Sequence, residues 1–330
     1  MKVLNLMINY EDLFINKIYG NLLSHQRVND DNLLKINISI TNDCNQKCEY
    51  CIANTPNIKN KYYINKEYIK FLFKYLKKNN FDRKFRINLL GGEPTLHTEL
   101  NDIIDSIKYN YSNNIIKLFT NGSQSIDYYK NMIHKYNNLT FDISYHPKFA
   151  NTNKYIDIIN MFKNNNPNNI YYIINIVLVY EYYDKILDFI NKANDINGNI
   201  NFILLFGVDY VNTKYNIFND IINNMKNNSE FLEYKLTFEN KEIILPYKDI
   251  AYYSTFTNIF KNMKCNIYDT QWSISNNIIM PLCNTKKYYK LLPNEIKLFI
   301  NDYYNYRNGV ECQLNTCNMD CLIDVYKHKN

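Results

Sequence analysis

Short apolar runs alternate with amphipathic segments through the first two thirds of the chain. The apolar runs have the composition of strands, and they span residues 35–41, 85–90, 114–120, 139–145, 170–180 and 199–206. In the segments between and after them, apolar residues recur at helical spacing; these span residues 66–78, 99–111, 126–136, 154–162, 184–193 and 218–225. Strand–helix units in succession predict a parallel sheet. Six units suit a partly open (β/α)6 barrel better than the closed eightfold one.

The alternation stops near residue 228. Residues 233–247 predict a hairpin, and a helix near 250–263 follows it. A second hairpin is expected to turn near Ser275 to Asn277, and a helix near 294–306 comes after it. The pattern therefore predicts an α/β protein in three parts: an N-terminal extension (1–34), a (β/α)6 core (35–228) and a small α+β domain (229–330).

Composition narrows the classes of function. The chain has 330 residues, of which 46% are hydrophobic, enough for a full core. Its 38 basic and 32 acidic residues are scattered, so nucleic acid is not indicated as a partner. The apolar stretches, such as 202–208, are too short to span a bilayer, so no membrane partner is expected. Polar residues interrupt the apolar N-terminus where a secretory signal would be, and we expect a cytoplasmic location.

Three cysteines lie close together in the stretch ITNDCNQKCEYC, residues 40–51. Cys44, Cys48 and Cys51 have the spacing C-x3-C-x2-C in the loop after the first predicted strand, where parallel α/β folds place their chemistry. Thiolates bind iron–sulfur clusters or zinc. Three of them can each hold one iron of a [4Fe–4S] cluster and leave the fourth iron for another ligand. Zinc, with a fourth cysteine from the tail, is the alternative.

A second motif, GGEP, follows the second predicted strand at residues 91–94. Together with the cysteine spacing and with Tyr50 just before the third cysteine, this motif makes the chain resemble the radical SAM superfamily over about residues 35–206. The resemblance implies a SAM-binding [4Fe–4S] cluster on Cys44, Cys48 and Cys51. It also implies reductive cleavage of S-adenosylmethionine (SAM) to a 5′-deoxyadenosyl radical, which abstracts a hydrogen atom from a substrate. An electron donor such as flavodoxin or ferredoxin would be a partner.

The resemblance also assigns a SAM pocket. Two glycines let a backbone approach a ligand closely, and a carboxylate accepts hydrogen bonds from an ammonium group; Glu93 would therefore hold the SAM amine. The expected SAM contacts are Tyr50, Gly91, Gly92, Glu93, Asn121, Ser144 and Asn175. His146, two residues beyond Ser144, is a candidate substrate contact.

Five further cysteines follow the predicted core: Cys265, Cys283, Cys312, Cys317 and Cys321. Their arrangement around a hairpin and a helix resembles the twitch and SPASM extensions, which hold auxiliary [4Fe–4S] clusters. The resemblance implies one auxiliary cluster, with Cys265, Cys283, Cys317 and Cys321 as its ligands. Cys312 would remain the free thiol, with Cys317 as its rival. The spare thiol would be idle, a further cluster ligand, or the donor of a hydrogen atom to a substrate radical. A structural zinc ribbon is the alternative for the whole set.

The residues and the resemblance together predict a radical SAM oxidoreductase or maturase that modifies a peptide or protein. The alternative is a radical dehydrogenase or epimerase that acts on a small molecule such as a sugar or nucleoside. A zinc-stabilised binding protein without chemistry is the third hypothesis.

Overall fold

The computed structural model describes a nearly continuous region up to residue 204 and several segments after it. The described residues are 33–51, 53, 55–81, 83–167, 170–178, 182–196, 199–204, 233–238, 241–246, 264–265, 268, 271–281, 288–307 and 310–311. The chain divides into two compact units, and the larger comprises residues 30–203 and 266–309. This larger unit contains every described helix and nearly all of the main sheet.

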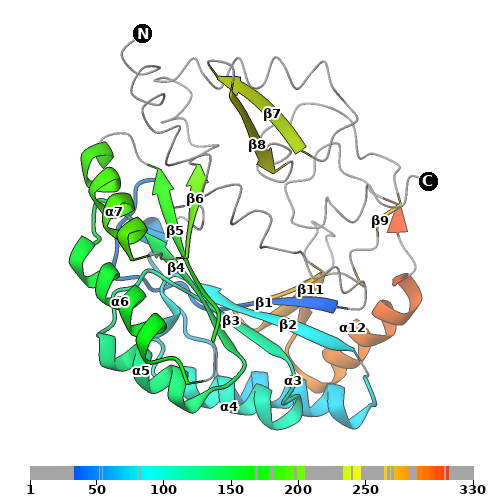
Figure 1. Cartoon of the computed structure of the whole chain (residues 1–330). Helices are drawn as coiled ribbons and strands as arrows, with labels where there is room; N and C mark the ends of the chain where they lie inside the picture. Colours follow the sequence, from blue (N-terminus) through cyan, green and yellow to red (C-terminus); the bar gives the residue numbers. More distant parts are fainter. Residues whose placement is uncertain are drawn as a thin grey trace. The chain divides into compact units, whose positions relative to one another are not determined.

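The main sheet has nine strands among the described residues, in the order β12-β11-β10-β1-β2-β3-β4-β5-β6 (Figure 1). The strands are β1 (Leu33–Thr41), β2 (Lys84–Gly91), β3 (Ile115–Thr120), β4 (Leu139–Tyr145), β5 (Tyr172–Leu178), β6 (Ile200–Leu204), β10 (Gln271–Ser275), β11 (Ile278–Pro281) and β12 (Tyr289–Lys290). Strands β1 to β5 pair in parallel with their neighbours. This order confirms the six predicted strands of the core, which follow one another across the sheet.

The helices of the larger unit lie along the outer face of this curved sheet (Figure 1). They are α3 (Lys66–Lys78), α4 (Leu100–Asn110), α5 (Ile126–Lys135), α6 (Thr152–Asn164), α7 (Tyr183–Asp195) and α12 (Pro293–Tyr306). Asn65, Ser125 and Asn151 cap α3, α5 and α6, because each side chain accepts a hydrogen bond from a backbone N–H of the first turn. Helices on one face of a parallel sheet confirm the predicted partial barrel.

Successive residues of the strands point to opposite faces of the sheet. One face packs on the helices; Phe85 of β2 meets Phe73 of α3 with 6.1 Å between ring centroids. The other face, which we call the polar face, carries polar side chains on β1 to β4. Its residues include Lys35, Asn37, Ser39, Arg86, Asn88, Lys117 and Asp142. The core therefore lies between sheet and helices, and the polar face is left for other contacts.

The second predicted hairpin is confirmed, but it belongs to the main sheet. Strands β10 and β11 pair antiparallel, and the turn between them places Asn276 and Asn277 at φ values of 47° and 62°. Asparagine tolerates this left-handed region better than most residues. Strand β10 pairs in parallel with β1, so part of the region predicted as a separate domain continues the sheet of the core.

The other described segments form small ladders. The first predicted hairpin is confirmed as β7 (Glu233–Phe238) and β8 (Lys241–Pro246), and β9 (Lys264–Cys265) pairs with β13 (Val310–Glu311). The helices expected near 218–225 and 250–263 lie outside the described residues. None of the described helices has the length and apolar character that a membrane span requires.

Trp272 on β10 ties the hairpin to the helix layer. Its ring is fully buried and meets Phe299 of α12 at 4.8 Å and Phe81 at 5.4 Å between centroids. We expect Trp272→Ala to lower the free energy of unfolding by about 3–5 kcal/mol, because it leaves a cavity. Leu298→Ala on the exposed side of α12 should change it by less than about 0.5 kcal/mol. Denaturant unfolding of both variants measures the difference, and equal effects would contradict the packing described here.

Candidate functional site

The backbone of Gly91 and Gly92 lies directly against the end of β1. The Gly92 N–H donates to the Thr41 carbonyl at 2.8 Å, and the Glu93 N–H donates to the Asp43 carbonyl at 2.7 Å. A Cβ on Gly91 would lie 2.0 Å from the Thr41 oxygen, and one on Gly92 would lie 2.0 Å from the Asp43 oxygen. The glycines therefore permit a close approach to the backbone that leads into the cysteine loop.

The Glu93 carboxylate joins the ends of β2 and β3. It is fully buried. Its Oε1 accepts hydrogen bonds from the Thr95 N–H at 3.1 Å, the Thr95 hydroxyl at 2.6 Å and the Thr120 hydroxyl at 2.7 Å. Its Oε2 accepts one from the Asn121 N–H at 2.6 Å. Burial raises the pKa of Glu93, and these hydrogen bonds oppose the shift because they stabilise the charged form.

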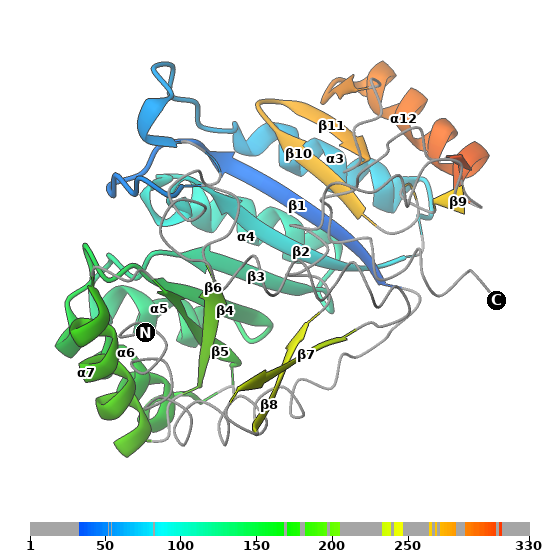
Figure 2. The same cartoon turned by 90° about the horizontal axis from the view of Figure 1, so that it is seen from above.

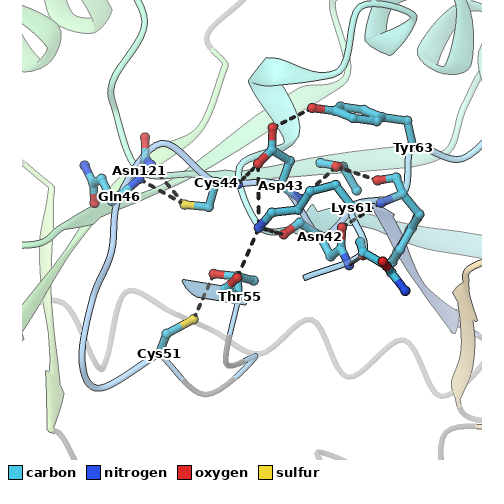
Figure 3. A network of polar contacts seen from close by, with 12 residues as sticks. Asn42, Asp43, Cys44, Gln46, Cys51, Thr55, Lys61, Tyr63 and Asn121 are labelled. Carbon is cyan, nitrogen blue, oxygen red and sulfur yellow. Dashed lines mark hydrogen bonds and ion pairs between the residues drawn. The ribbon is translucent and has the colours of Figure 1, made fainter. Parts of the chain in front are cut away.

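Asn121 extends this connection from Glu93 to the cysteine loop. Its side-chain amide donates to Asn45 Oδ1 at 2.8 Å, and it also donates to the Cys44 sulfur at 3.8 Å (Figure 3). Hydrogen bonds to the sulfur ligands of an iron–sulfur cluster influence its reduction potential. Asn121 thus links Glu93 to the cysteine loop, and its contact with SAM stays a prediction.

Tyr155 of α6 holds the ends of β3 and β4 together. Its buried hydroxyl lies 2.5 Å from the Asn121 carbonyl and 2.8 Å from the Ser144 carbonyl, and it donates to them. A Cβ on Gly122 would lie 2.7 Å from this hydroxyl, and the φ of Gly122 is 67°. Glycine at this position therefore leaves room for the tyrosine and adopts a backbone conformation that other residues disfavour.

The cysteine loop returns to β1 through a short bridge between Thr41 and Tyr63. Asp43 reinforces the closure: one carboxylate oxygen accepts from the Tyr63 hydroxyl at 2.6 Å, and the other lies 3.7 Å from the Lys61 ammonium (Figure 3). The Cys44 N–H donates to the same carboxylate at 3.0 Å. Both ends of the loop are consequently fixed to β1. The sequence does not reveal this closure, because its partners are ordinary polar residues.

The three thiols of the loop have different neighbours. Cys48 is buried, and Cys44 and Cys51 are half-buried. The Cys44 sulfur accepts from the Gln46 N–H at 3.4 Å, and the Cys51 sulfur lies 3.4 Å from the Thr55 hydroxyl (Figure 3). Burial, and then the charges of Cys44 and Cys51, raise the pKa of Cys48 to about 12. The thiols therefore oppose one another's ionisation, which a cationic metal centre would relieve.

This donor set fits an iron–sulfur cluster by its chemistry, since soft thiolates are the usual ligands of such clusters. Among the described residues, no three His, Cys, Asp or Glu side chains are arranged as a metal-binding group.

Tyr50, between the second and third cysteines, reaches the end of β4. Its hydroxyl lies 3.2 Å from Nδ1 of His146, and the two rings stack with centroids 5.8 Å apart. An exposed ion pair of 2.6 Å between Glu49 and Lys148 adds a second link from the loop to the same region. Burial lowers the pKa of His146 to about 4, so the ring is neutral at pH 7. His146, the candidate substrate contact, is therefore the hydrogen-bond and stacking partner of Tyr50.

Comparison of the chain with models of protein families decides which family it belongs to. The model of the radical SAM superfamily matches residues 38–215, more than half of the chain, including the cysteine loop and the Gly91–Glu93 segment. The chain belongs to the radical SAM superfamily. The predicted family is confirmed, and the protein is an enzyme. Radical SAM enzymes use a [4Fe–4S] cluster and SAM, so both cofactors follow from membership.

Solved structures of radical SAM enzymes share this fold. SuiB of Streptococcus suis bound to S-adenosylmethionine is 15% identical; the match covers 95% of this chain and 79% of that one, with a TM-score of 0.53. The enzyme anSMEcpe with bound AdoMet is 17% identical over 82% of each chain, with a TM-score of 0.50. At such low identity the similarity establishes the fold alone.

A curated relative matches a shorter stretch. The probable GTP 3′,8-cyclase of Methanococcus aeolicus is 40% identical over 90 residues, which are 26% of this chain and 29% of the relative. The match thus spans less than a third of the relative's length.

The remaining predicted SAM contacts of this radical SAM enzyme lie on β4 and β5. Ser144 and Asn175 are register partners on these neighbouring strands. Asn175 is buried, and its amide donates to the Asp142 carboxylate. Their contact with SAM stays a prediction. Of the tail cysteines, Cys265 is described only as part of β9, and the others lie outside the described residues: Cys283, Cys312, Cys317 and Cys321.

Glu93→Gln tests how far the site depends on this carboxylate. In either orientation the glutamine amide would turn a donor toward the N–H of Thr95 or Asn121, so we expect a loss of about 1–3 kcal/mol of unfolding free energy. The control Glu67→Gln, on the exposed surface of α3, should change it by less than about 0.5 kcal/mol. Denaturant unfolding measures both, and an unperturbed Glu93→Gln variant would contradict the structural role.

His146 predicts a pH dependence of stability. The pKa of the folded state, about 4, lies below the ordinary 6.5, so the unfolded chain binds the proton first as pH falls. The neutral His146 ring therefore contributes fully to the free energy of unfolding above about pH 6.5. At pH 5 this contribution is smaller by about 2 kcal/mol. We expect His146→Gln to lose less stability than the wild type between pH 7.5 and 5 in denaturant unfolding. Parallel pH profiles for the two proteins would show that the ring titrates normally.

Proposed function

We propose that the protein holds its [4Fe–4S] cluster on Cys44, Cys48 and Cys51, binds SAM beside it and abstracts a hydrogen atom from a peptide or protein substrate. The observation that carries the site assignment is the attachment of the cysteine loop to three strand ends at once. Gly91 and Gly92 fix it to β2, and Asn121 fixes it to β3. When bound and reduced, the cluster supplies the electron that cleaves SAM to a 5′-deoxyadenosyl radical.

The chain's own residues bind and orient the cofactors in this proposal. The three thiols give up their protons when they bind iron. Glu93 is proposed to accept the SAM amine, and Oε2 is the oxygen with capacity left, since it accepts one described hydrogen bond and Oε1 accepts three. Tyr50, held by His146, would present its ring beside the third cysteine.

The tail is proposed to hold an auxiliary [4Fe–4S] cluster, with Cys312 as the free hydrogen-donating thiol. The pairing of Cys265 with Val310 supports a compact tail site, because Val310 precedes Cys312 by two residues in the sequence. By the same argument Cys312 could be a ligand of the auxiliary cluster instead of a free thiol. The iron content of the Cys312→Ala variant separates these two roles, because only the loss of a ligand should lower it. An electron donor such as flavodoxin or ferredoxin completes the proposed system.

A small-molecule substrate is the second candidate. The 90-residue match to the probable GTP 3′,8-cyclase of Methanococcus aeolicus favours it, because that relative is named for a nucleotide substrate. The arrangement of the tail cysteines favours the peptide or protein. Family membership removes the third hypothesis, a zinc-stabilised binding protein without chemistry.

Replacing Cys44, Cys48 and Cys51 with alanine tests the ligand assignment. We expect the triple variant to form no 5′-deoxyadenosine from SAM under reducing, anaerobic conditions and to lose about four irons per chain. Liquid chromatography of the nucleoside and iron analysis measure the two effects, with the Glu67→Gln protein as a matched control. Continued SAM cleavage by the triple variant would place the cluster elsewhere.

A further inference from the structure

Strands β10, β1 and β2 are neighbours in the main sheet (Figure 2), and each carries a polar residue near its start: Gln271, Lys35 and Arg86. Lys35 of β1 is the register partner of Gln271 on one side and of Arg86 on the other. All three belong to the polar face, because the next residue on each strand is fully buried on the helix face. Neighbouring strands lie about 4.8 Å apart, so the amide, ammonium and guanidinium groups are within reach of one small ligand group.

Buried polar atoms of Gln271 and Arg86 have no hydrogen-bond partner in the part of the chain that the structure describes. Gln271 is 1% exposed, yet neither Oε1 nor Nε2 has a hydrogen-bond partner. Nε of Arg86 is buried and equally unpartnered. Neither Arg86 nor Lys35 forms an ion pair with a described residue. Buried polar groups without partners and adjacent like charges both oppose folding, so this row has a cost that the fold itself does not explain.

The polar face offers no spare carboxylate to neutralise the row. On strands β1 to β5 and β10, Asp142 is the acidic residue of this face. It is engaged by the Lys117 ammonium at 3.0 Å and by the Asn175 amide. Among the described residues, no ion pair takes up the charge of Lys35 and Arg86, and we infer that a ligand does.

We propose that Lys35, Arg86 and Gln271 form an anchor for an anionic group, a carboxylate or a phosphate, of an elongated substrate. This inference rests on the proposed function, since the ligand is the substrate of that reaction. A guanidinium binds either anion through two parallel hydrogen bonds, and the lysine adds a second charge. The Gln271 amide supplies a neutral donor to the same group.

The length of the substrate follows from the position of the anchor. Lys35 precedes the end of β1 by six residues, which is about 20 Å of strand. The cysteine loop begins at that far end, so a substrate must extend along β1 to meet both. One row nearer the loop, Oδ1 of Asn88 is buried and unpartnered while its amide donates to Asn37 at 2.7 Å. Asn88 is placed to accept a hydrogen bond from the middle of the same ligand.

Anion binding to the full-length, anaerobically reconstituted protein tests the anchor. Isothermal titration calorimetry at low ionic strength uses pyrophosphate as the phosphate probe and glutarate as the carboxylate probe. We expect saturable binding of at least one, and the tighter probe identifies phosphate or carboxylate as the preferred group. Arg86→Gln and Lys35→Gln should each weaken it about tenfold or more, since a charge-assisted contact is lost. Lys74→Gln, which changes an exposed lysine of α3, should bind as the wild type does.

Thermal unfolding without anion separates binding from structure. Removal of an unpaired charge should leave the midpoint of Arg86→Gln unchanged or raised, whereas a structural arginine would lower it. Arg86→Lys, which keeps the charge, should retain part of the binding. The anchor is refuted if the wild type binds neither probe, or if Arg86→Gln binds as tightly as the wild type. SAM cleavage by the wild type, measured in parallel, tests the proposed function independently. Its absence beside intact anion binding would refute that function and leave an anion site whose ligand is not the substrate of that reaction.

Discussion

The buried carboxylate of Glu93 is the interaction on which the geometry of the site depends. Backbone hydrogen bonds space the parallel strands themselves, but no tight turn joins the segments beyond their carboxyl ends, so other contacts must fix the positions of those segments. Glu93 does this by accepting hydrogen bonds from Thr95, Thr120 and Asn121. Because Asn121 also meets Cys44, the same carboxylate fixes the position of the cysteine loop relative to β3.

The two faces of the sheet have different roles: one packs on the helices and stabilises the fold, and the other carries the polar side chains. The helix face is built from fully buried aliphatic and aromatic residues, and the cysteine loop is attached at the carboxyl edge of the strands. The polar face carries cations at the amino end of β1 and β2 and a Lys117–Asp142 ion pair further along the sheet. A substrate that reacts at the loop and is held at the row of cations would lie along this face. Unpaired charges destabilise the folded state, and a binding site is where such a destabilising feature is expected.

Much of the fold could be predicted from the sequence because its signals are local. Strand and helix periodicity located β1 to β6 and α3 to α7 within a few residues, and consecutive asparagines marked the turn between β10 and β11. The pairing of β10 with β1 could not be predicted, since the two are more than 230 residues apart and no local pattern records a partner. For the same reason the motif at Gly91 to Glu93 was visible, but its contacts with Thr41, Asp43 and Thr120 were not. Those partners are common residues brought together only by the fold.

Electron paramagnetic resonance of the reduced wild-type protein tests the central claim most directly. The claim is that the loop attached to β1, β2 and β3 holds a [4Fe–4S] cluster with one iron open to SAM. Spectra recorded with and without SAM should both show a reduced cluster, and the signal should change when SAM is added, because its ligand occupies the open iron. A signal that SAM leaves unchanged, at a concentration that saturates binding, would contradict the account.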